Sequence, residues 1–406
     1  MVAPQMSAHA ILIAMEPRSL IHIRHLINTV GARPSCSPAV RHAATECARV
    51  LQACGAVETR LQSFQGVPET YLPFLWAFGA AALGSLLALL GSTAIFFALG
   101  AVLNALGVWA MLAESEFRSH WATPLIPRRE TVNLITRFEP LETPRQTVVL
   151  CAHLDTHRTP VFYSTNAWLK AFGALVSGCF LSMALGALAF TVAALFGWAW
   201  MRWLALPLFL LQSFAAGMML HALRTPHTPG ANDNASGVGV ILSTVERLMN
   251  QPLRHTRLYA LLTDCEETGA WGMRAFLDRH ADETGRDALY VILDQVGAGE
   301  LRVLTRDGLI FKHPTHPQAL QWARKAVQAQ PVPYKEVIGT AYTDALPATL
   351  RGRIALTVCA IPPSGETTSA RWHQMSDIPE ALEAQALADA EAFTWTLLQV
   401  VDEEPE

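Results

Sequence analysis

The sequence is poor in charge. Only 16% of its 406 residues are Asp, Glu, Lys or Arg, and the formal net charge is −4. Proteins that bind nucleic acid usually carry a basic surface that neutralises phosphates, so we expect no nucleic acid partner. Hydrophobic residues instead make up 51% of the chain, and the mean hydropathy of +0.25 leans toward the composition of membrane proteins.

Paired cysteines are also lacking. The apolar stretch from Ala8 to Met15 is short, contains His9 and has no cleavage site, so no signal peptide is predicted. An odd number of scattered cysteines without a Cys-x-x-Cys pair suggests neither a disulfide framework nor a thiolate zinc site, and fits a reducing compartment best. The seven are Cys36, Cys47, Cys54, Cys151, Cys179, Cys265 and Cys359.

Two long segments lack charge almost completely. No Asp, Glu, Lys or Arg occurs from Thr70 to Ala113, and Arg202 is the one such residue from Ala171 to Leu223. A helical membrane span needs about 20 apolar residues, so each segment has room for two. Buried helices of a large soluble core rarely need uncharged runs this long. We therefore expect transmembrane helical hairpins at residues 71–113 and 170–223, with the lipid bilayer as a partner.

The rest of the chain alternates between apolar strand patterns and helical patterns. Strands that read as continuous apolar runs and alternate with helices predict a mostly parallel sheet covered on both faces. We expect one discontinuous α/β domain of three layers, α/β/α, formed by residues 16–70, 114–169 and 224–406. The predicted strands are residues 131–138, 147–152, 257–263, 288–293 and 354–361, and the clearest helices are 237–250 and 316–330.

Imidazole and carboxylate side chains follow the predicted strands where each strand ends. In a parallel sheet these ends meet at one edge, where ligands bind. Taken alone, each residue is explained better by a structural role, such as a solvated turn, a helix cap or a surface histidine. Several at one edge predict a functional site, and the candidates are His153, Asp155, Glu266, Glu267, Asp294 and His373, with Asp233 before a glycine-rich helix start.

This set of residue types suits divalent metals. Imidazole and carboxylate without thiolate are typical zinc ligands. Two ions that share a carboxylate lower the pKa of a water and polarise a carbonyl, which is the chemistry of hydrolysis. In the adjacent pair Glu266 and Glu267, one carboxylate can bind metal while the other moves a proton.

The motifs also resemble a known family. The order His-x-Asp, Gly-Ala-x-Asp-Asn-x-Ser-Gly, Glu-Glu-x-Gly, Leu-Asp and a late His is similar to that of the co-catalytic di-zinc exopeptidases, typified by bacterial leucyl aminopeptidase, aminopeptidase Y and plasma glutamate carboxypeptidase. The resemblance implies their phosphorylase/hydrolase-like fold, two Zn²⁺ per chain and a peptide substrate. It also implies residue roles: His153 and Asp294 on one zinc, Glu267 and His373 on the other, Asp233 bridging, Glu266 as general base and Asp155 hydrogen-bonded to the imidazole of His153.

Three further points come with the resemblance. The family holds the peptide bond after its bridging Asp in the cis form, so the bond between Asp233 and Asn234 is expected to be cis. The usual Tyr-His-Thr around the last ligand reads "RWHQMSD" here, which makes His373 the assignment with the weakest motif. Asp344, in "YTDAL", receives no role.

The favoured function is a membrane-anchored zinc aminopeptidase. A glutaminyl-cyclase-like acyltransferase that uses a single zinc would need fewer ligands, so the presence of His153 beside the others argues against it. A non-catalytic receptor or scaffold of the same fold would have lost ligands, and none is missing. The sequence leaves open whether the amino or the carboxyl end of a peptide is recognised, and which oligomeric state forms.

Charge near the hairpins predicts the orientation. Each hairpin returns to the side it left, so all segments of the α/β domain share one compartment. By the positive-inside rule that compartment is the cytoplasm, and the protein is an integral protein of the bacterial inner membrane. The second hairpin also leaves just after Asp155, which predicts a metal centre near the membrane surface. The basic flanks are Arg118, Arg128, Arg129, Lys170 and Arg224.

Overall fold

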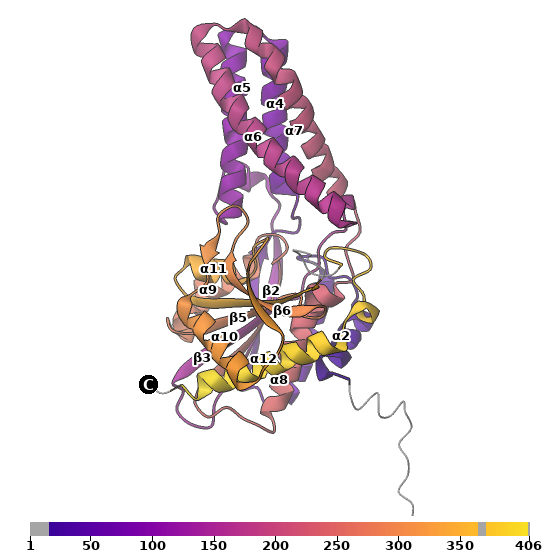
Figure 1. Cartoon of the computed structure of the whole chain (residues 1–406), viewed down its shortest axis with the longest axis vertical. Coiled ribbons are helices and arrows are strands. Elements are labelled where there is room, and N and C mark those ends of the chain that lie inside the picture. The colour runs from indigo at the N-terminus through magenta and orange to yellow at the C-terminus, as the bar shows by residue number, and fades with distance from the viewer. Residues whose placement is uncertain (1–15, 364–370, 405–406) are drawn as a thin grey trace, which may run out of the picture. The chain divides into compact units, whose positions relative to one another are not determined.

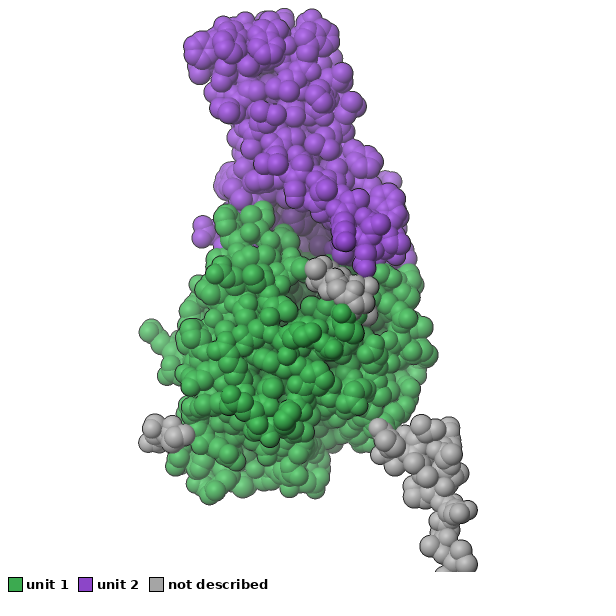
Figure 2. All heavy atoms as spheres, viewed as in Figure 1, with its two compact units in different colours: residues 1–66, 129–157, 227–406 green, residues 67–128, 158–226 purple. Residues whose placement is uncertain are grey.

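The computed structural model describes residues 16–363 and 371–404, and the stretch from Ala8 to Met15 lies outside them. The chain divides into two compact units (Figure 2). The first unit comprises residues 1–66, 129–157 and 227–406, and the second comprises residues 67–128 and 158–226.

Among the described residues, the first unit contains one nine-stranded sheet (Figure 1). Its path runs β1-β2-β4-β3-β5-β9-β6-β7, with β8 paired to β6. The four central strands β4, β3, β5 and β9 are parallel, while β1, β2 and β7 pair antiparallel, as does β6 with β9. The predicted parallel sheet is thus confirmed at its centre, where the site residues follow. The strands are β1 Glu58–Gly66, β2 Arg129–Phe138, β3 Gln146–His153, β4 Thr256–Thr263, β5 Leu289–Leu293, β6 Glu300–Asp307, β7 His313–Pro314, β8 Tyr334–Ile338 and β9 Ile354–Ile361.

Helices cover both faces of this sheet. Successive residues of a strand point to opposite faces, and β3 shows it: Leu150 belongs to the core cluster on one face, and Val149 and Cys151 belong to the cluster on the other. The three-layer α/β/α arrangement is therefore confirmed. The first face is covered by α2 Arg18–Thr29, α3 Pro38–Ala53, α8 Ser236–Leu248, α10 Pro317–Ala329 and α12 Ala384–Asp402, and the second by α9 Trp271–Thr284 and α11 Ala345–Leu350.

The second unit is a bundle of apolar helices. In the described part of the chain, four helices are long and apolar enough to cross a membrane. Large apolar side chains point outward from the bundle, including Leu90 at 73% and Leu195 at 74% exposure. A soluble protein rarely leaves so much contiguous apolar surface in water. The helices are α4 Leu72–Leu90, α5 Ala94–Ser115, α6 Asn166–Phe196 and α7 Arg202–Ala222.

Inside this bundle, one polar side chain from each helix joins a buried hydrogen-bond network. The Ser85 hydroxyl donates to Gln212 Oε1 at 2.8 Å. Gln212 Nε2 donates to Asn104 Oδ1 at 2.9 Å and to Ser182 Oγ at 3.2 Å. Polar side chains and small residues at helix contacts are the usual means of holding membrane helices together. The network therefore fixes how the four helices pack.

Candidate metal centre

The ends of the parallel strands and the loops beyond them bring all seven predicted site residues into one buried cluster. His153 is the last residue of β3, Asp294 follows β5 directly, and Glu266 and Glu267 follow β4. Asp233 lies in the short turn η4, Ala231–Ala235, that precedes α8. None of the seven is more than 7% exposed; they are His153, Asp155, Asp233, Glu266, Glu267, Asp294 and His373.

Asp233 lies between two groups of ligand-type side chains. Its Oδ1 is 3.2 Å from His153 Nε2, and its Oδ2 is 3.2 Å from His373 Nε2. On the His153 side, Asp294 Oδ1 lies 3.6 Å from the same imidazole nitrogen. On the other side, Glu267 Oε2 lies 3.3 Å from His373 Nε2. One carboxylate thus presents one oxygen to each group.

The second group contains a residue that the sequence did not lead us to assign. His157 offers a ligand atom within 4.8 Å of ligand atoms of Glu267 and His373. Its ring stacks on that of His373, with centroids 3.6 Å apart and an interplanar angle of 16°. The alternation His153-x-Asp155-x-His157 is the signal that could have revealed it, because residues two apart share a face in extended backbone.

Asp155 orients the loop of the two glutamates more than it orients the imidazole. Its carboxylate accepts hydrogen bonds from the Ser35 hydroxyl at 2.6 Å and from the backbone N–H groups of Glu266 and Glu267 at 3.2 and 3.3 Å. His153 Nδ1 lies 3.0 Å from the backbone carbonyl of Asp155 and 3.5 Å from its carboxylate. The imidazole thus lies closer to the carbonyl than to the carboxylate of Asp155, and the role expected for this carboxylate stays a prediction.

The Gly-Ala-Asn-Asp-Asn-Ala-Ser motif fixes Asp233 through its neighbours. Asn234 donates to the carbonyl of Leu293 at 2.8 Å and accepts from the backbone N–H of Gln295 at 3.2 Å, so it ties Asp233 to both sides of Asp294. Asp377 accepts from the backbone N–H of Asp233 at 3.0 Å. The bond between Asp233 and Asn234 is cis, as expected.

Arg33 ties the chain just after His153, at the end of β3, to the chain just before the turn that carries Asp233. This fully buried guanidinium donates to the carbonyls of Leu154 at 2.6 Å, Pro229 at 3.0 Å and Gly230 at 3.0 Å. Burial lowers the pKa of Arg33 to about 10, so the group keeps its charge at neutral pH. Charged donors make the stronger hydrogen bonds of proteins. Arg33 therefore positions the ligands without touching them.

Replacing Arg33 by Met should destabilise the protein by about 3 kcal/mol, because several buried carbonyls lose a charged donor. The midpoint of thermal unfolding, with and without added Zn²⁺, measures the effect. Arg24→Met is the matched control on the neighbouring helix α2, since Arg24 makes only a surface ion pair with Glu16. A control variant that unfolds as early as Arg33→Met would contradict this role.

The charges of the site are mutually dependent. Burial raises the pKa of Glu266 well above its usual value and that of Glu267 to about 7. Burial would lower the pKa of His373, but the nearby Glu267 carboxylate and the hydrogen bond with Asp233 raise it to about 9. For Asp233, burial would raise the pKa, but hydrogen bonds with His153 and His373 lower it overall. The cluster therefore brings several buried carboxylates together, and their ionised forms need positive charge close by for stabilisation.

The residues fit divalent metal ions. Apart from the imidazole nitrogens at 3.2 and 3.6 Å, the buried atoms Asp233 Oδ2 and Asp294 Oδ1 have no hydrogen-bond donor among the described residues. Buried carboxylate oxygens normally have hydrogen-bond partners or coordinate metal. The donor set of imidazole nitrogens and carboxylate oxygens suits zinc. The groups whose ligand atoms converge are His153, Asp233 and Asp294, and His157, Glu267 and His373.

Asp344, which received no role from the sequence, contacts the central strands β3 and β4 close to the site. Its Oδ2 accepts from the Thr263 hydroxyl at 2.6 Å and lies 3.6 Å from the Cys151 sulfur, and both residues belong to central strands. Burial raises the pKa of Asp344 to about 6. Its contacts are with the ends of β3 and β4.

Residues 218–398 match the model of Peptidase family M28. This segment carries Asp233, Glu266, Glu267, Asp294 and His373, while His153 precedes it. The predicted resemblance is therefore confirmed at the level of this peptidase family, without a subfamily. No curated protein is significantly similar in sequence to the chain.

Solved structures share the fold at low sequence identity. A glutaminyl cyclase from Bacteroides thetaiotaomicron bound to N-acetylhistamine has a TM-score of 0.57 and 15% identity, covering 99% of each chain. A zinc aminopeptidase from Bacillus subtilis has a TM-score of 0.56 and 15% identity, covering 94% of this chain and 93% of that one. A Zn-dependent exopeptidase from Parabacteroides distasonis has a TM-score of 0.54 and 13% identity, covering 99% and 100%. These likenesses confirm the zinc-exopeptidase fold.

Proposed function

We propose that the protein is a membrane-anchored metallo-aminopeptidase that binds two Zn²⁺ and hydrolyses the terminal peptide bond of short peptides. The observation that carries this proposal is Asp233, which directs one carboxylate oxygen at each of two ligand groups. A single-metal enzyme has no need of that arrangement. Active sites with two metal ions close together are common in aminopeptidases.

In this proposal, His153 and Asp294 would hold one ion, Glu267 and His373 would hold the other, and Asp233 would supply a carboxylate oxygen to each. When bound, the ions supply Lewis-acid polarisation of the peptide carbonyl and lower the pKa of water. Glu266 then takes a proton from the attacking water and delivers it to the leaving amine. Its carboxylate lies 4.0 Å from His153 Nε2, and its raised pKa suits both steps.

Glutaminyl cyclisation is the second candidate, since a glutaminyl cyclase is among the structures with this fold. A non-catalytic receptor or scaffold is disfavoured, because the structure keeps every predicted ligand buried in one cluster. Aminopeptidase and glutaminyl cyclase activity differ in the product that is released. A peptidase releases an amino acid from a free N-terminus, whereas a cyclase releases ammonia from an N-terminal Gln.

The test uses the full-length protein purified in detergent and loaded with Zn²⁺. Metal content is measured by mass spectrometry, and peptides with varied free N-termini, the same peptides N-acetylated, and Gln-peptides are assayed. Release of the first residue from free peptides only, with about two metals per chain, is the expected result. Ammonia release from Gln-peptides with one metal would establish the cyclase, and cleavage at the carboxyl end would overturn the proposed polarity.

His157 is proposed to support the second metal position. His157→Ala should lower the affinity for the second Zn²⁺ about tenfold or more, because residues that orient or join a metal's ligands typically contribute this much. Isothermal titration with Zn²⁺, and the absorption bands of Co²⁺ bound in its place, report the second site separately from the first. Retention of both affinities and of the Co²⁺ spectrum in His157→Ala would show that the stacked ring has no such role.

Membrane anchoring is supported by the aromatic turn between α6 and α7. The rings of Trp198 and Trp200 stack at 6.2 Å, and the Arg202 guanidinium lies 4.7 Å from the ring of Trp203. The side chains of Trp198, Trp200 and Trp203 are exposed. Exposed Trp beside Arg is typical of membrane interfaces. We propose an integral protein of the bacterial inner membrane with the metal centre on the cytoplasmic side.

Labelling of intact cells tests this orientation. A thiol introduced by Ser92→Cys, in the exposed turn between α4 and α5, should react with a membrane-impermeant maleimide. A thiol introduced by Gln385→Cys, on the exposed surface of α12, should react only after the cells are permeabilised. The wild-type protein is the control for native cysteines. The reverse pattern would place the metal centre outside the cytoplasm.

A further inference from the structure

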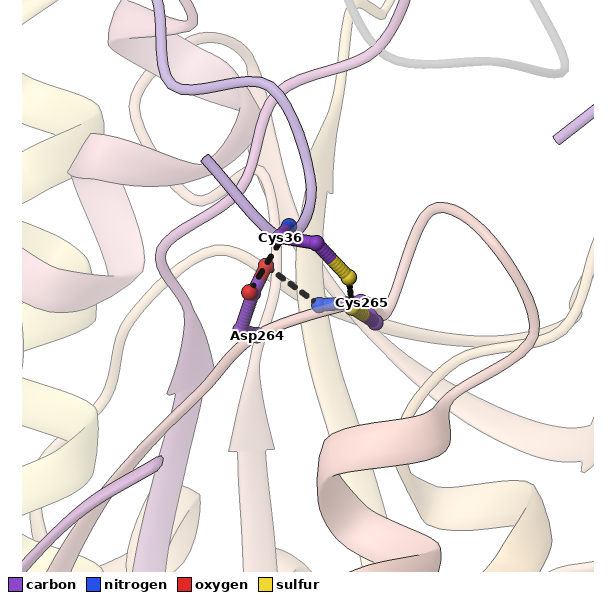
Figure 3. Close-up of side chains that lie close together, drawn as sticks. All are labelled: Cys36, Asp264 and Cys265. Carbon is purple, nitrogen blue, oxygen red and sulfur yellow. Dashed lines mark hydrogen bonds between the residues drawn. The ribbon is translucent and has the colours of Figure 1, made fainter. Parts of the chain in front are cut away.

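Two cysteines from distant parts of the sequence meet beside the metal centre. The sulfur of Cys36 lies 3.2 Å from that of Cys265, and both residues are free thiols (Figure 3). Cys265 is fully buried, while Cys36 is partly exposed. The pair lies in neither of the two ligand groups described above.

The backbone around the pair holds the sulfurs together. The Asp264 carboxylate accepts hydrogen bonds from the backbone N–H of Cys36 at 3.0 Å and of Cys265 at 2.6 Å, as Figure 3 shows. Both cysteines have left-handed backbone, with φ of 59° and 60°. Such backbone is unusual for residues other than glycine and persists only where the surroundings impose it. The juxtaposition is therefore built into the fold.

Gly66 leaves the space that the two sulfurs occupy. A Cβ at this position would lie 2.6 Å from the Cys265 sulfur and 2.8 Å from the Cys36 sulfur. Any larger residue would push the thiols aside.

A third metal ion does not explain the pair well. Asp264, whose carboxylate groups with the two thiols among the described residues, also accepts a hydrogen bond from the Thr131 hydroxyl. Both of its oxygens are thus engaged by donors from the chain. Thiol chemistry between the sulfurs themselves requires no change in those hydrogen bonds.

The pair is linked to the candidate general base on both sides. Cys265 directly precedes Glu266. Cys36 follows Ser35, whose hydroxyl donates to the same Asp155 carboxylate that holds the backbone N–H of Glu266. A covalent bond between the sulfurs would join the loop after α2 to the loop that carries Glu266.

We propose that Cys36 and Cys265 are a modification site that forms a reversible disulfide when a hydroperoxide reaches it. The Cys36 thiolate attacks the terminal oxygen of the hydroperoxide, the O–O bond breaks, and a sulfenic acid forms. The other oxygen leaves as alkoxide, or as hydroxide from hydrogen peroxide, and takes a proton from solvent to become an alcohol or water. The Cys265 sulfur then attacks the sulfenic sulfur, and the disulfide forms as water leaves. Cys36 reacts first because it is the exposed member, and a dithiol reductant reverses the reaction by thiol–disulfide exchange.

Disulfide formation should lower the activity. A disulfide requires an S–S distance of about 2.05 Å, so the sulfurs must move together by about 1 Å. That movement starts one residue from Glu266, and misplacement of a catalytic group by about 1 Å can cost 10²-fold in rate. This consequence rests on the proposed function, whereas the disulfide itself does not.

Peptide mapping of the full-length protein in detergent tests the proposal. After treatment with hydrogen peroxide and alkylation of the remaining thiols, the peptides that contain Cys36 and Cys265 should be cross-linked, and dithiothreitol should separate them. Cys47 and Cys359 should stay alkylatable after unfolding, because burial raises the pKa of each to about 12 and hinders oxidation. Absence of the cross-link, with Cys36 unmodified or oxidised only to an acid, would overturn the proposal.

Activity supplies the second readout. Peroxide should lower kcat of the wild type at least tenfold with metal content unchanged, and dithiothreitol should restore it. Cys36→Ser should keep its basal activity and resist peroxide, and Cys265→Ser, which lacks the resolving thiol, should form no cross-link. If peroxide inactivated Cys36→Ser as much as the wild type, the disulfide would not be the cause of the lost activity. A protein that forms the cross-link but never hydrolyses peptides would refute the proposed function and leave the modification site standing.

Discussion

Replacing Glu266 by Gln should lower kcat for peptide hydrolysis by about 10³-fold while the protein keeps two Zn²⁺ per chain. The amide keeps the size of the carboxylate and cannot take a proton from water. General acid–base catalysis contributes about 10²–10⁴-fold, so the loss falls in that range. Steady-state kinetics and metal analysis of the same preparation measure both effects.

The neighbouring glutamate provides the matched control. Glu267→Gln changes the same functional group one residue away, but here the lost carboxylate is a proposed metal ligand 3.3 Å from His373 Nε2. This variant should bind only one Zn²⁺ tightly, and added Zn²⁺ should restore part of its activity. Added metal should do nothing for Glu266→Gln. Wild-type activity in Glu266→Gln would end its assignment as the base.

The central strands were predictable because burial on both faces leaves a continuous apolar run in the sequence. All five predicted strands are present, and residues of the site follow the ends of β3, β4 and β5. The missed strands lie toward the edges. β1, for example, alternates between buried and exposed residues and is rich in polar side chains. Its place is decided by pairing with β2 along its whole length, which the local sequence does not specify.

The ligand-type residues were predictable for a different reason. Each combines a metal-binding side chain with a position just after a buried strand or before a helix, so residue type and local pattern agree. Arg33 offers no such local sign, because its partners Leu154 and Gly230 are more than a hundred residues away in the sequence. The role of Asp155 was only partly predictable, since its carboxylate also accepts hydrogen bonds from the loop of the two glutamates, besides lying 3.5 Å from the imidazole of His153.

The uncharged segments locate the apolar helices, but they do not reveal how the helices pack. Ser85 and Gln212 are ordinary polar residues within long apolar runs. Their hydrogen bond across the bundle depends on the relative rotation of α4 and α7, which is a tertiary property. The same limit applies to Cys36 and Cys265, whose scattered positions suggested no pairing.

Replacing Asp233 by Ala should empty both metal positions at once. Its two oxygens face His153 and His373 separately, so one substitution removes a ligand from each group. We expect less than one tightly bound Zn²⁺ per chain and loss of detectable hydrolysis. Because metal binding to the folded protein adds to its stability, the increase in the thermal midpoint that Zn²⁺ gives the wild type should also disappear.

Asp294→Ala separates this outcome from general damage to the site. Asp294 is a buried carboxylate of the same size and faces only His153, at 3.6 Å. Its loss should therefore weaken one metal position and leave the pair of Glu267 and His373 able to bind the other. Competition with a chromophoric chelator gives the number of sites and the affinity of each variant. If Asp233→Ala and Asp294→Ala both lose a single Zn²⁺, Asp233 belongs to one metal position only and does not bridge the two.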